Sequence, residues 1–227
     1  MRIFFLLLLL LFNLNVGSEA NQKTKLQESK LIEYHDNGNL KKVVHYLGKK
    51  KHGSEIYYSA NGIKILELTF INSIQDGPET HYYPSPKVIK KALINYKSGL
   101  KEGKMMTWHK NGRLSGIAYF KNGHHDNISR AWHENGNIKA VGFFKNGLQD
   151  GLEIQYFKNG KKRGSANFKK GKIEGLETQW YESGVKKSEI IFKNSIATKQ
   201  QKYWSKNGLL LDAKSLNDFQ QNKKFSH

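Results

Sequence analysis

Hydrophobic and polar residues alternate strictly along short stretches of this chain. The segments LEIQY (152–156) and LETQW (176–180) show the alternation most clearly. A period of two is typical of a β-strand with one half-buried face. Asn-Gly, Asp-Gly and Glu-Gly pairs bound these segments, and they favour tight turns because they tolerate positive φ. The pattern therefore predicts a series of β-hairpins.

The hairpin pattern repeats every 24 residues. The turn glycines mark the period at Gly38, Gly62, Gly112, Gly136, Gly160, Gly184 and Gly208. A first aromatic series keeps the same spacing at Tyr34, Tyr58, Tyr82, Trp108, Trp132, Tyr156, Trp180 and Trp204. A second aromatic series runs in step at Tyr46, Phe70, Tyr96, Phe120, Phe144, Phe168 and Phe192. All series share one two-residue insertion around Pro84 and Pro86, so the chain is a true repeat array.

Two strands of ~7 residues and two short turns account for a 24-residue unit without room for a helix. We therefore expect an all-β protein, an elongated single-layer twisted antiparallel sheet of tandem 24-residue hairpin repeats. About eight hairpins would occupy residues 30–211. The sequence leaves open whether the two aromatic series share a face, because two-residue and bulged three-residue turns give opposite parity.

The repeat unit resembles a known family. The segments TWHKNG (107–112), YFKNG (119–123) and FFKNGLQDGLEIQYFKNG (143–160) carry the resemblance. They are similar to the MORN repeat family, in its bacterial variant type found in YwqK-like antitoxin family proteins. The resemblance extends from residue 34 to about residue 210 and implies an elongated sheet that is used as a binding scaffold.

The N-terminal segment predicts export. Arg2 precedes an apolar run of about ten residues, which is too short for a membrane span of ~20. Ser18-Glu19-Ala20 follows with small residues at the positions that a signal peptidase recognises. Residues 1–20 are therefore predicted to be a signal peptide cleaved near Ala20, followed by a linker over 21–29. We expect a periplasmic or secreted protein, and the lack of cysteine disfavours a lipid anchor.

Residues 212–227 are expected to form a C-terminal tail or cap. Leu216 and Phe219 suggest a short helix there that covers the last strand edge.

The chain is strongly basic, with a formal net charge of +19. Such a charge favours anionic partners such as lipid headgroups or acidic glycans. A predicted export signal disfavours nucleic acid. The alternative interpretation is a solvated rim of lysines. The candidate basic patch comprises Lys49, Lys50, Lys51, Lys161, Lys162, Arg163, Lys186 and Lys187.

No sequence motif indicates an enzyme. The chain has no phosphate-binding loop, zinc-type His-Glu spacing or nucleophile elbow. Acids recur with the repeat at Asp76, Glu102, Asp126, Asp150 and Glu174, and again at Glu55, Glu79, Glu153 and Glu177. We interpret them as turn formers and cross-strand partners of lysine. His124-His125-Asp126 is a dense patch in a turn and is weak evidence for a metal site. We predict a non-enzymatic protein without a cofactor or metal.

The first aromatic series is either a packing ladder or a binding surface. Its candidate members are Tyr58, Tyr82, Trp108, Trp132, Tyr156, Trp180 and Trp204, and the tryptophans are expected to be partly exposed. The leading hypothesis is an exported scaffold of the cell envelope that recognises a protein, or an anionic partner such as a membrane surface or glycan. The alternatives are an antitoxin-like or immunity-like inhibitor of a partner protein and a basic protein that binds anionic lipid surfaces.

Overall fold

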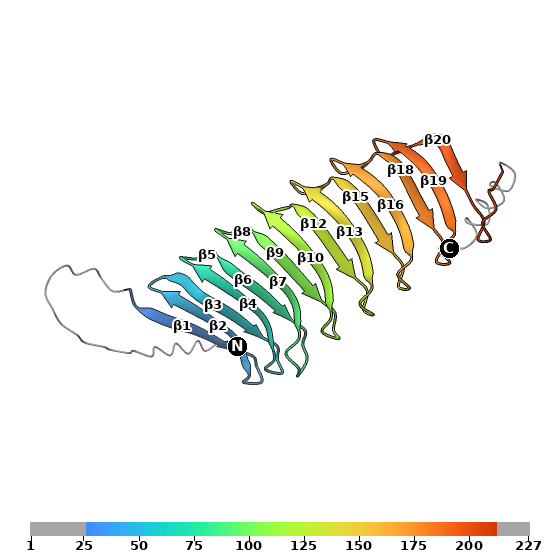
Figure 1. Cartoon of the computed structure of the whole chain (residues 1–227). Helices are drawn as coiled ribbons and strands as arrows, with labels where there is room; N and C mark the ends of the chain where they lie inside the picture. Colours follow the sequence, from blue (N-terminus) through green and yellow to red (C-terminus); the bar gives the residue numbers. More distant parts are fainter. Residues whose placement is uncertain (1–25, 213–227) are drawn as a thin grey trace. The chain divides into compact units, whose positions relative to one another are not determined.

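The computed structural model describes residues 26–212, which divide at Gly112 into two compact units. Every regular element in these residues is a β-strand, and the strands follow one another as antiparallel hairpins (Figure 1). No helix that could cross a membrane occurs between residues 26 and 212. The predicted signal peptide and the predicted C-terminal helix lie outside the described residues.

The first unit, residues 26–112, contains the strands β1 to β9, which form successive antiparallel pairs; β5 and β6 are two pieces that both pair with β4, and β8 and β9 both pair with β7. Their bounds are β1 (Glu28–Tyr34), β2 (Leu40–Leu47), β3 (Lys50–Tyr58), β4 (Lys64–Ile71), β5 (Ile74–Gln75), β6 (Gly77–Tyr82), β7 (Lys90–Lys97), β8 (Leu100–Lys101) and β9 (Gly103–Trp108). β1 starts two residues inside the predicted linker, because Glu28 and Ser29 already pair with Leu47 and Tyr46.

The second unit, from residue 113 to residue 212, contains the strands β10 to β20 in the same arrangement. Their bounds are β10 (Leu114–Lys121), β11 (His124–His125), β12 (Asn127–Trp132), β13 (Ile138–Lys145), β14 (Leu148–Gln149), β15 (Gly151–Tyr156), β16 (Lys162–Lys169), β17 (Lys172–Ile173), β18 (Gly175–Trp180), β19 (Lys186–Lys193) and β20 (Ile196–Tyr203). The predicted fold class of tandem antiparallel hairpins is confirmed.

Most repeats contain a break after the second residue of one strand. A two-residue strand then precedes a six-residue strand, as in β14 and β15. The residue that opens the longer piece has positive φ: Gly77, Gly103, Asn127, Gly151 and Gly175. Glycine and asparagine tolerate this conformation better than other residues do. This requirement explains the recurring Asp-Gly and Glu-Gly pairs of the sequence.

The strand register places the two aromatic series on opposite faces of each sheet. Phe70 lies opposite Gly53, two residues from Glu55, whereas Tyr58 is three residues from Glu55 and pairs with Lys64. Alternate side chains of a strand point to opposite faces. We call the side with Glu55, its repeat equivalents and the second aromatic series the glutamate face. The other side, with the first aromatic series, is the tryptophan face.

Side-chain hydrogen bonds join each repeat to the next. The residue after the first aromatic donates to the backbone carbonyl of the aromatic in the following repeat. His35 Nε2 reaches the Tyr58 carbonyl at 3.0 Å, and His133 Nε2 reaches the Tyr156 carbonyl at 3.0 Å. Tyrosine hydroxyls make the same bond at 2.9 Å from Tyr83 to Trp108 and from Tyr181 to Trp204. We call this contact the repeat lock.

The recurring turn acids form a second connection between repeats. Four of these carboxylates accept a hydrogen bond from a backbone amide in the next turn, as Asp76 does from Ser98 at 3.0 Å and Glu174 from Asn194 at 2.9 Å. Asp126 and Asp150 accept the equivalent bonds from Asn146 and Lys170. These acids therefore satisfy backbone donors instead of pairing with lysine.

Candidate functional site

The first aromatic series alternates with lysine on the tryptophan face. The ammonium groups of Lys162 and Lys186 lie 5.8 Å and 5.6 Å from the ring centroids of Trp180 and Trp204. Lys64 lies 4.8 Å from the ring of Tyr82. Among the seven candidate aromatics, Tyr82 is buried, and the others are half-buried: Tyr58, Trp108, Trp132, Tyr156, Trp180 and Trp204. The tryptophans are thus partly exposed, as Tyr58 and Tyr156 are in the same series.

The candidate basic residues are divided between the two units. Lys49, Lys50 and Lys51 belong to the first unit, and Lys51 already pairs with Glu55 at 2.6 Å. The others lie on two successive repeats of the second unit: Lys161, Lys162, Arg163, Lys186 and Lys187. Within that group, Lys161 Nζ donates to the Ser183 carbonyl at 2.5 Å. Several of these cations therefore have structural partners inside the sheet.

The glutamate face carries one carboxylate in the middle of each of four strands: β3, β6, β15 and β18. Glu55 is 2% exposed and accepts hydrogen bonds from Lys51 Nζ and Tyr57 Oη, both at 2.6 Å. Lys42 lies 3.0 Å from the same carboxylate. Burial by itself raises the pKa of Glu55, but the bonds from Lys51, Tyr57 and Lys42 outweigh it and hold the pKa below its usual value.

The equivalent glutamates in the other repeats have amide and imidazole partners. Glu79 accepts from Gln75 at 2.7 Å and from His81 at 2.6 Å. Glu153 accepts from Gln149 and Gln155, and Glu177 accepts from Gln179 at 3.0 Å. The interpretation of these acids as lysine partners is therefore correct for Glu55 and wrong for the other members, because glutamine or histidine occupies the neighbouring positions.

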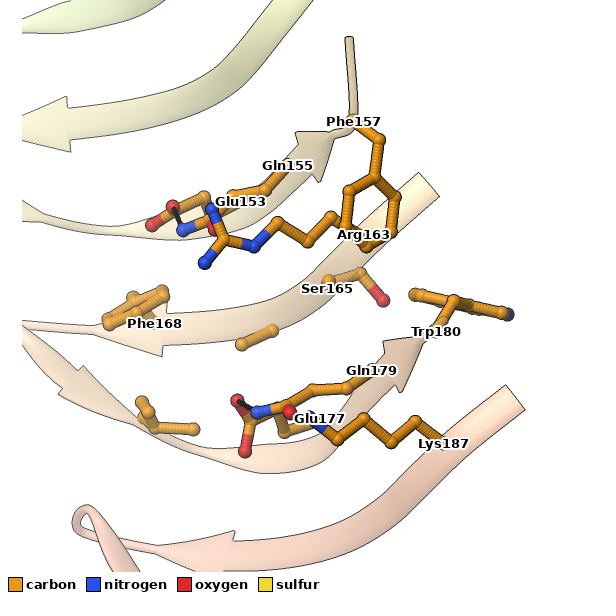
Figure 2. Close-up of a pocket in the computed structure, with 13 residues that line it drawn as sticks. Glu153, Gln155, Phe157, Arg163, Ser165, Phe168, Glu177, Gln179, Trp180 and Lys187 are labelled. Atoms are coloured by element: carbon orange, nitrogen blue, oxygen red, sulfur yellow. Dashed lines mark hydrogen bonds between the residues drawn. The ribbon is translucent and has the colours of Figure 1, made fainter. Parts of the chain in front are cut away.

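A groove opens on the glutamate face of the second unit, between β15 and β19. Its volume is about 500 Å³. Figure 2 shows Glu153 and Gln155 on β15, Phe168 on β16, and Glu177 and Gln179 on β18. Phe157 and Trp180 border the groove at the strand ends. The groove thus combines apolar and aromatic side chains, including Phe168 and Ile173, with a few polar ones, which is typical of a binding site.

Two cations complete the charge pattern of the groove. The Arg163 side chain extends over the groove toward Glu153 in Figure 2. In the part of the chain that the structure describes, its guanidinium forms neither an ion pair nor a hydrogen bond. Lys187 also lines the groove, with its ammonium 5.9 Å from the Tyr181 ring centroid. The groove thus offers two carboxylates, two cations and two amides.

Phe157 makes this repeat different from its neighbours. It occupies the position of the repeat lock, where His133 and Tyr181 donate to a backbone carbonyl. A phenyl ring cannot donate a hydrogen bond. In the sequence, Phe157 differs from the histidine or tyrosine found at this position in most other repeats. This difference is the signal that predicts a special role for Phe157, whereas the regular aromatic spacing pointed only to the tryptophan series.

The His124-His125-Asp126 patch has a packing role. The His125 ring stacks between Phe120 and Phe144, with centroid distances of 5.2 Å and 3.8 Å. Burial lowers the pKa of His125, and the nearby Asp126 partly opposes this effect. Across residues 26–212, no three or more histidine, aspartate or glutamate side chains gather in a way that could hold a metal ion.

Comparison with known proteins agrees with the repeat pattern. The family model of the MORN repeat variant matches residues 27–47, 101–122, 126–146, 149–170 and 173–194. A search of curated proteins found no significant match. The solved structures that match include the crystal structure of TcdB2-TccC3-Cdc42, with 12% identity and a TM-score of 0.23 over 78% of this chain. Another is TcdB2-TccC3 without its hypervariable C-terminal region, with 10% identity and a TM-score of 0.23 over 81% of this chain.

This chain spans 14% and 12% of those two proteins. The five family matches, together with the hairpin architecture, confirm the predicted resemblance to the MORN repeat variant. The chain belongs to the MORN repeat variant family.

Proposed function

We propose that this protein is a non-enzymatic, exported scaffold of the cell envelope whose second unit binds a polar segment of a partner protein. Repeats of this family generally serve as scaffolds or binding modules rather than as enzymes. The observation that carries the proposal is the groove between β15 and β19, where Arg163 and Lys187 lie with Glu153 and Glu177.

The mixed charge of the groove favours a protein over a polyanion. A run of phosphates or sulfates would meet Glu153 and Glu177 as well as the two cations, and like charges repel at such distances. A polypeptide segment offers both signs of charge, amide donors and carbonyl acceptors. Gln155 on β15 and Gln179 on β18 supply matching amide groups, with β16 between the two strands, and Phe157 and Trp180 can cover an apolar side chain.

Photo-crosslinking in the cells that make the protein tests this proposal. A photoreactive phenylalanine analogue in place of Phe157 should crosslink one envelope protein, and the same analogue in place of the exposed Ile74 should not. Arg163→Gln should reduce the crosslink strongly. Lys50→Gln removes the same charge from the first unit and should leave it unchanged.

The same experiment separates the alternatives. Crosslinks to lipid or glycan alone would contradict a protein partner and favour the basic surface binder. A crosslinked toxin whose activity falls on binding would favour the antitoxin-like inhibitor. Cell fractionation tests export, and an intact Met1 terminus in the cytosol would contradict it.

A further inference from the structure

A stripe of exposed apolar side chains crosses the tryptophan face of the second unit. Phe143 is 39% exposed, Leu152 43%, Leu176 48% and Ile191 36%. Leu176 pairs directly with Ile191, and Leu152 pairs with Asn167, which lies between the two halves of the stripe. These four residues, the apolar stripe, therefore form a row at right angles to the strands, on the face opposite the groove of Figure 2.

The repeat itself does not require apolar residues at these positions. In the first unit the positions equivalent to Phe143 are His45, Thr69 and Asn95. Each of these three side chains bonds to the backbone carbonyl of the residue nine positions later, at 2.8, 3.1 and 2.7 Å. Phenylalanine and isoleucine in the second unit cannot form this bond. The second unit therefore gives up this side-chain hydrogen bond and exposes apolar side chains in its place. Such an exposed apolar row indicates a surface that binds a partner.

A row of lysines runs beside the apolar stripe. Lys145, Lys169 and Lys193 are exposed, two residues beyond Phe143, Asn167 and Ile191 respectively. In the described residues 26–212, none of their ammonium groups has a hydrogen bond or an ion pair. The first unit carries Leu47, Ile71 and Lys97 at these positions. The second unit therefore combines an apolar stripe with an unneutralised lysine row.

The geometry points to an acidic amphipathic helix of a partner protein as the occupant. The stripe extends over the five neighbouring strands β13, β15, β16, β18 and β19, a width of about 19 Å at the usual strand spacing. A helix of about 13 residues has this length. Successive turns of a helix have nearly the same spacing as neighbouring strands, so one apolar side chain per turn can contact one strand. Carboxylates two turns apart on the helix can then reach the lysines, which lie on every second strand.

Other occupants fit this surface less well. A second copy of the chain would bring its own lysines, including Lys162 and Lys186, against the same face. A lipid bilayer would have to bury the Asn167 amide in the middle of the stripe, which is costly without a hydrogen-bond partner. A helix can place a polar side chain opposite Asn167.

Fluorescence anisotropy on the full chain tests the inference. The probe is a synthetic helical peptide of about 18 residues, with leucines on one face and glutamates along one flank. We expect saturable binding that Leu152→Ser/Leu176→Ser weakens at least about tenfold. Lys169→Glu should weaken binding further as salt is lowered, because repulsion is then less screened. The matched control, Ile74→Ser/Leu100→Ser, removes two similarly exposed side chains from the first unit, and we expect it to bind like the unsubstituted chain.

Circular dichroism and urea unfolding of each variant establish that the sheet is intact. The inference is overturned if a scrambled peptide of the same composition binds equally well. It is also overturned if the double variant instead abolishes binding to anionic vesicles or dissociates a homodimer in ultracentrifugation. Arg163→Gln should leave peptide affinity unchanged, so failure of the groove proposal and failure of this inference give different results.

Discussion

The two units are built from the same hairpin repeat, but they differ in whether the side chains near the two aromatic series are paired within the sheet or exposed. The first unit pairs its polar side chains internally, as in the network of Glu55 with Lys42, Lys51 and Tyr57. The second unit arranges exposed apolar and charged side chains in rows across its strands, as the apolar stripe and the lysine row. The comparison indicates that one set of repeats can maintain the sheet while another set presents surfaces for binding.

The largest expected effect concerns Glu55. Replacing it by alanine leaves two lysines and a tyrosine hydroxyl without their shared acceptor, and we expect a loss of about 3 kcal/mol in unfolding free energy. Glu177→Ala in the second unit removes one bond to Gln179 and should cost about 1 kcal/mol. Urea unfolding of both variants measures the difference. Equal losses would show that the first unit does not depend more strongly on its internal network.

The two units should also respond to acid at different pH values. The folded pKa of His125 in the second unit lies below its usual value of 6.5, so its stabilising contribution is present above pH 6.5 and lost as pH falls below it. The folded pKa values of Glu55 and Glu79 in the first unit also lie below their usual value of 4.5. Their contribution is present above pH 4.5 and is lost at lower pH, as the pH falls through the folded values.

Hydrogen exchange followed by mass spectrometry resolves the two units, after correction for the intrinsic pH dependence of exchange. Between pH 7.5 and 5.5 the peptides around His125 should lose protection, and those around Glu55 should not. His125→Gln places there the residue found at the equivalent Gln75 and Gln149. It should remove the loss between these pH values, and a loss that persists in this variant would assign it to another group.

The repeat lock offers a test within the second unit. His133→Phe removes the bond to the Tyr156 carbonyl and should cost about 1 kcal/mol. Phe157→His should introduce the missing bond and stabilise the sheet by a similar or smaller amount. Thermal unfolding compares the two variants. If both substitutions left the melting temperature unchanged, the lock would not contribute to stability.

The smallest effect is expected at the apolar stripe. Phe143→Thr introduces the residue found at the equivalent Thr69 of the first unit. Because Phe143 is exposed and the threonine can bond to the backbone, stability should change by less than about 0.5 kcal/mol. A large loss in the urea midpoint would mean that Phe143 packs as part of the sheet.

Much of the fold follows from the sequence, because glycine positions and strand alternation repeat seven or eight times and reinforce one another. Whether the two aromatic series share a face could not be predicted from the sequence, since it depends on the bulge that each turn introduces into the strand. The prediction that Glu79, Glu153 and Glu177 pair with lysine was wrong for a similar reason, because cross-strand neighbours are defined only when the register is known. The apolar stripe was missed because its members are nine or more residues apart in the sequence.

The positive-φ residue in each repeat has a consequence for how the chain reaches its native arrangement. Since only Gly77, Gly103, Asn127, Gly151 and Gly175 suit that kink, a strand that slips by two residues would force a side chain into an unfavourable backbone conformation. A slip by a whole repeat, in contrast, returns every kink to a suitable residue. The error that this protein must avoid during folding is therefore the omission of an entire hairpin, and the differences between repeats, such as histidine, tyrosine or phenylalanine at the lock position, are what distinguish the correct neighbour from the next one.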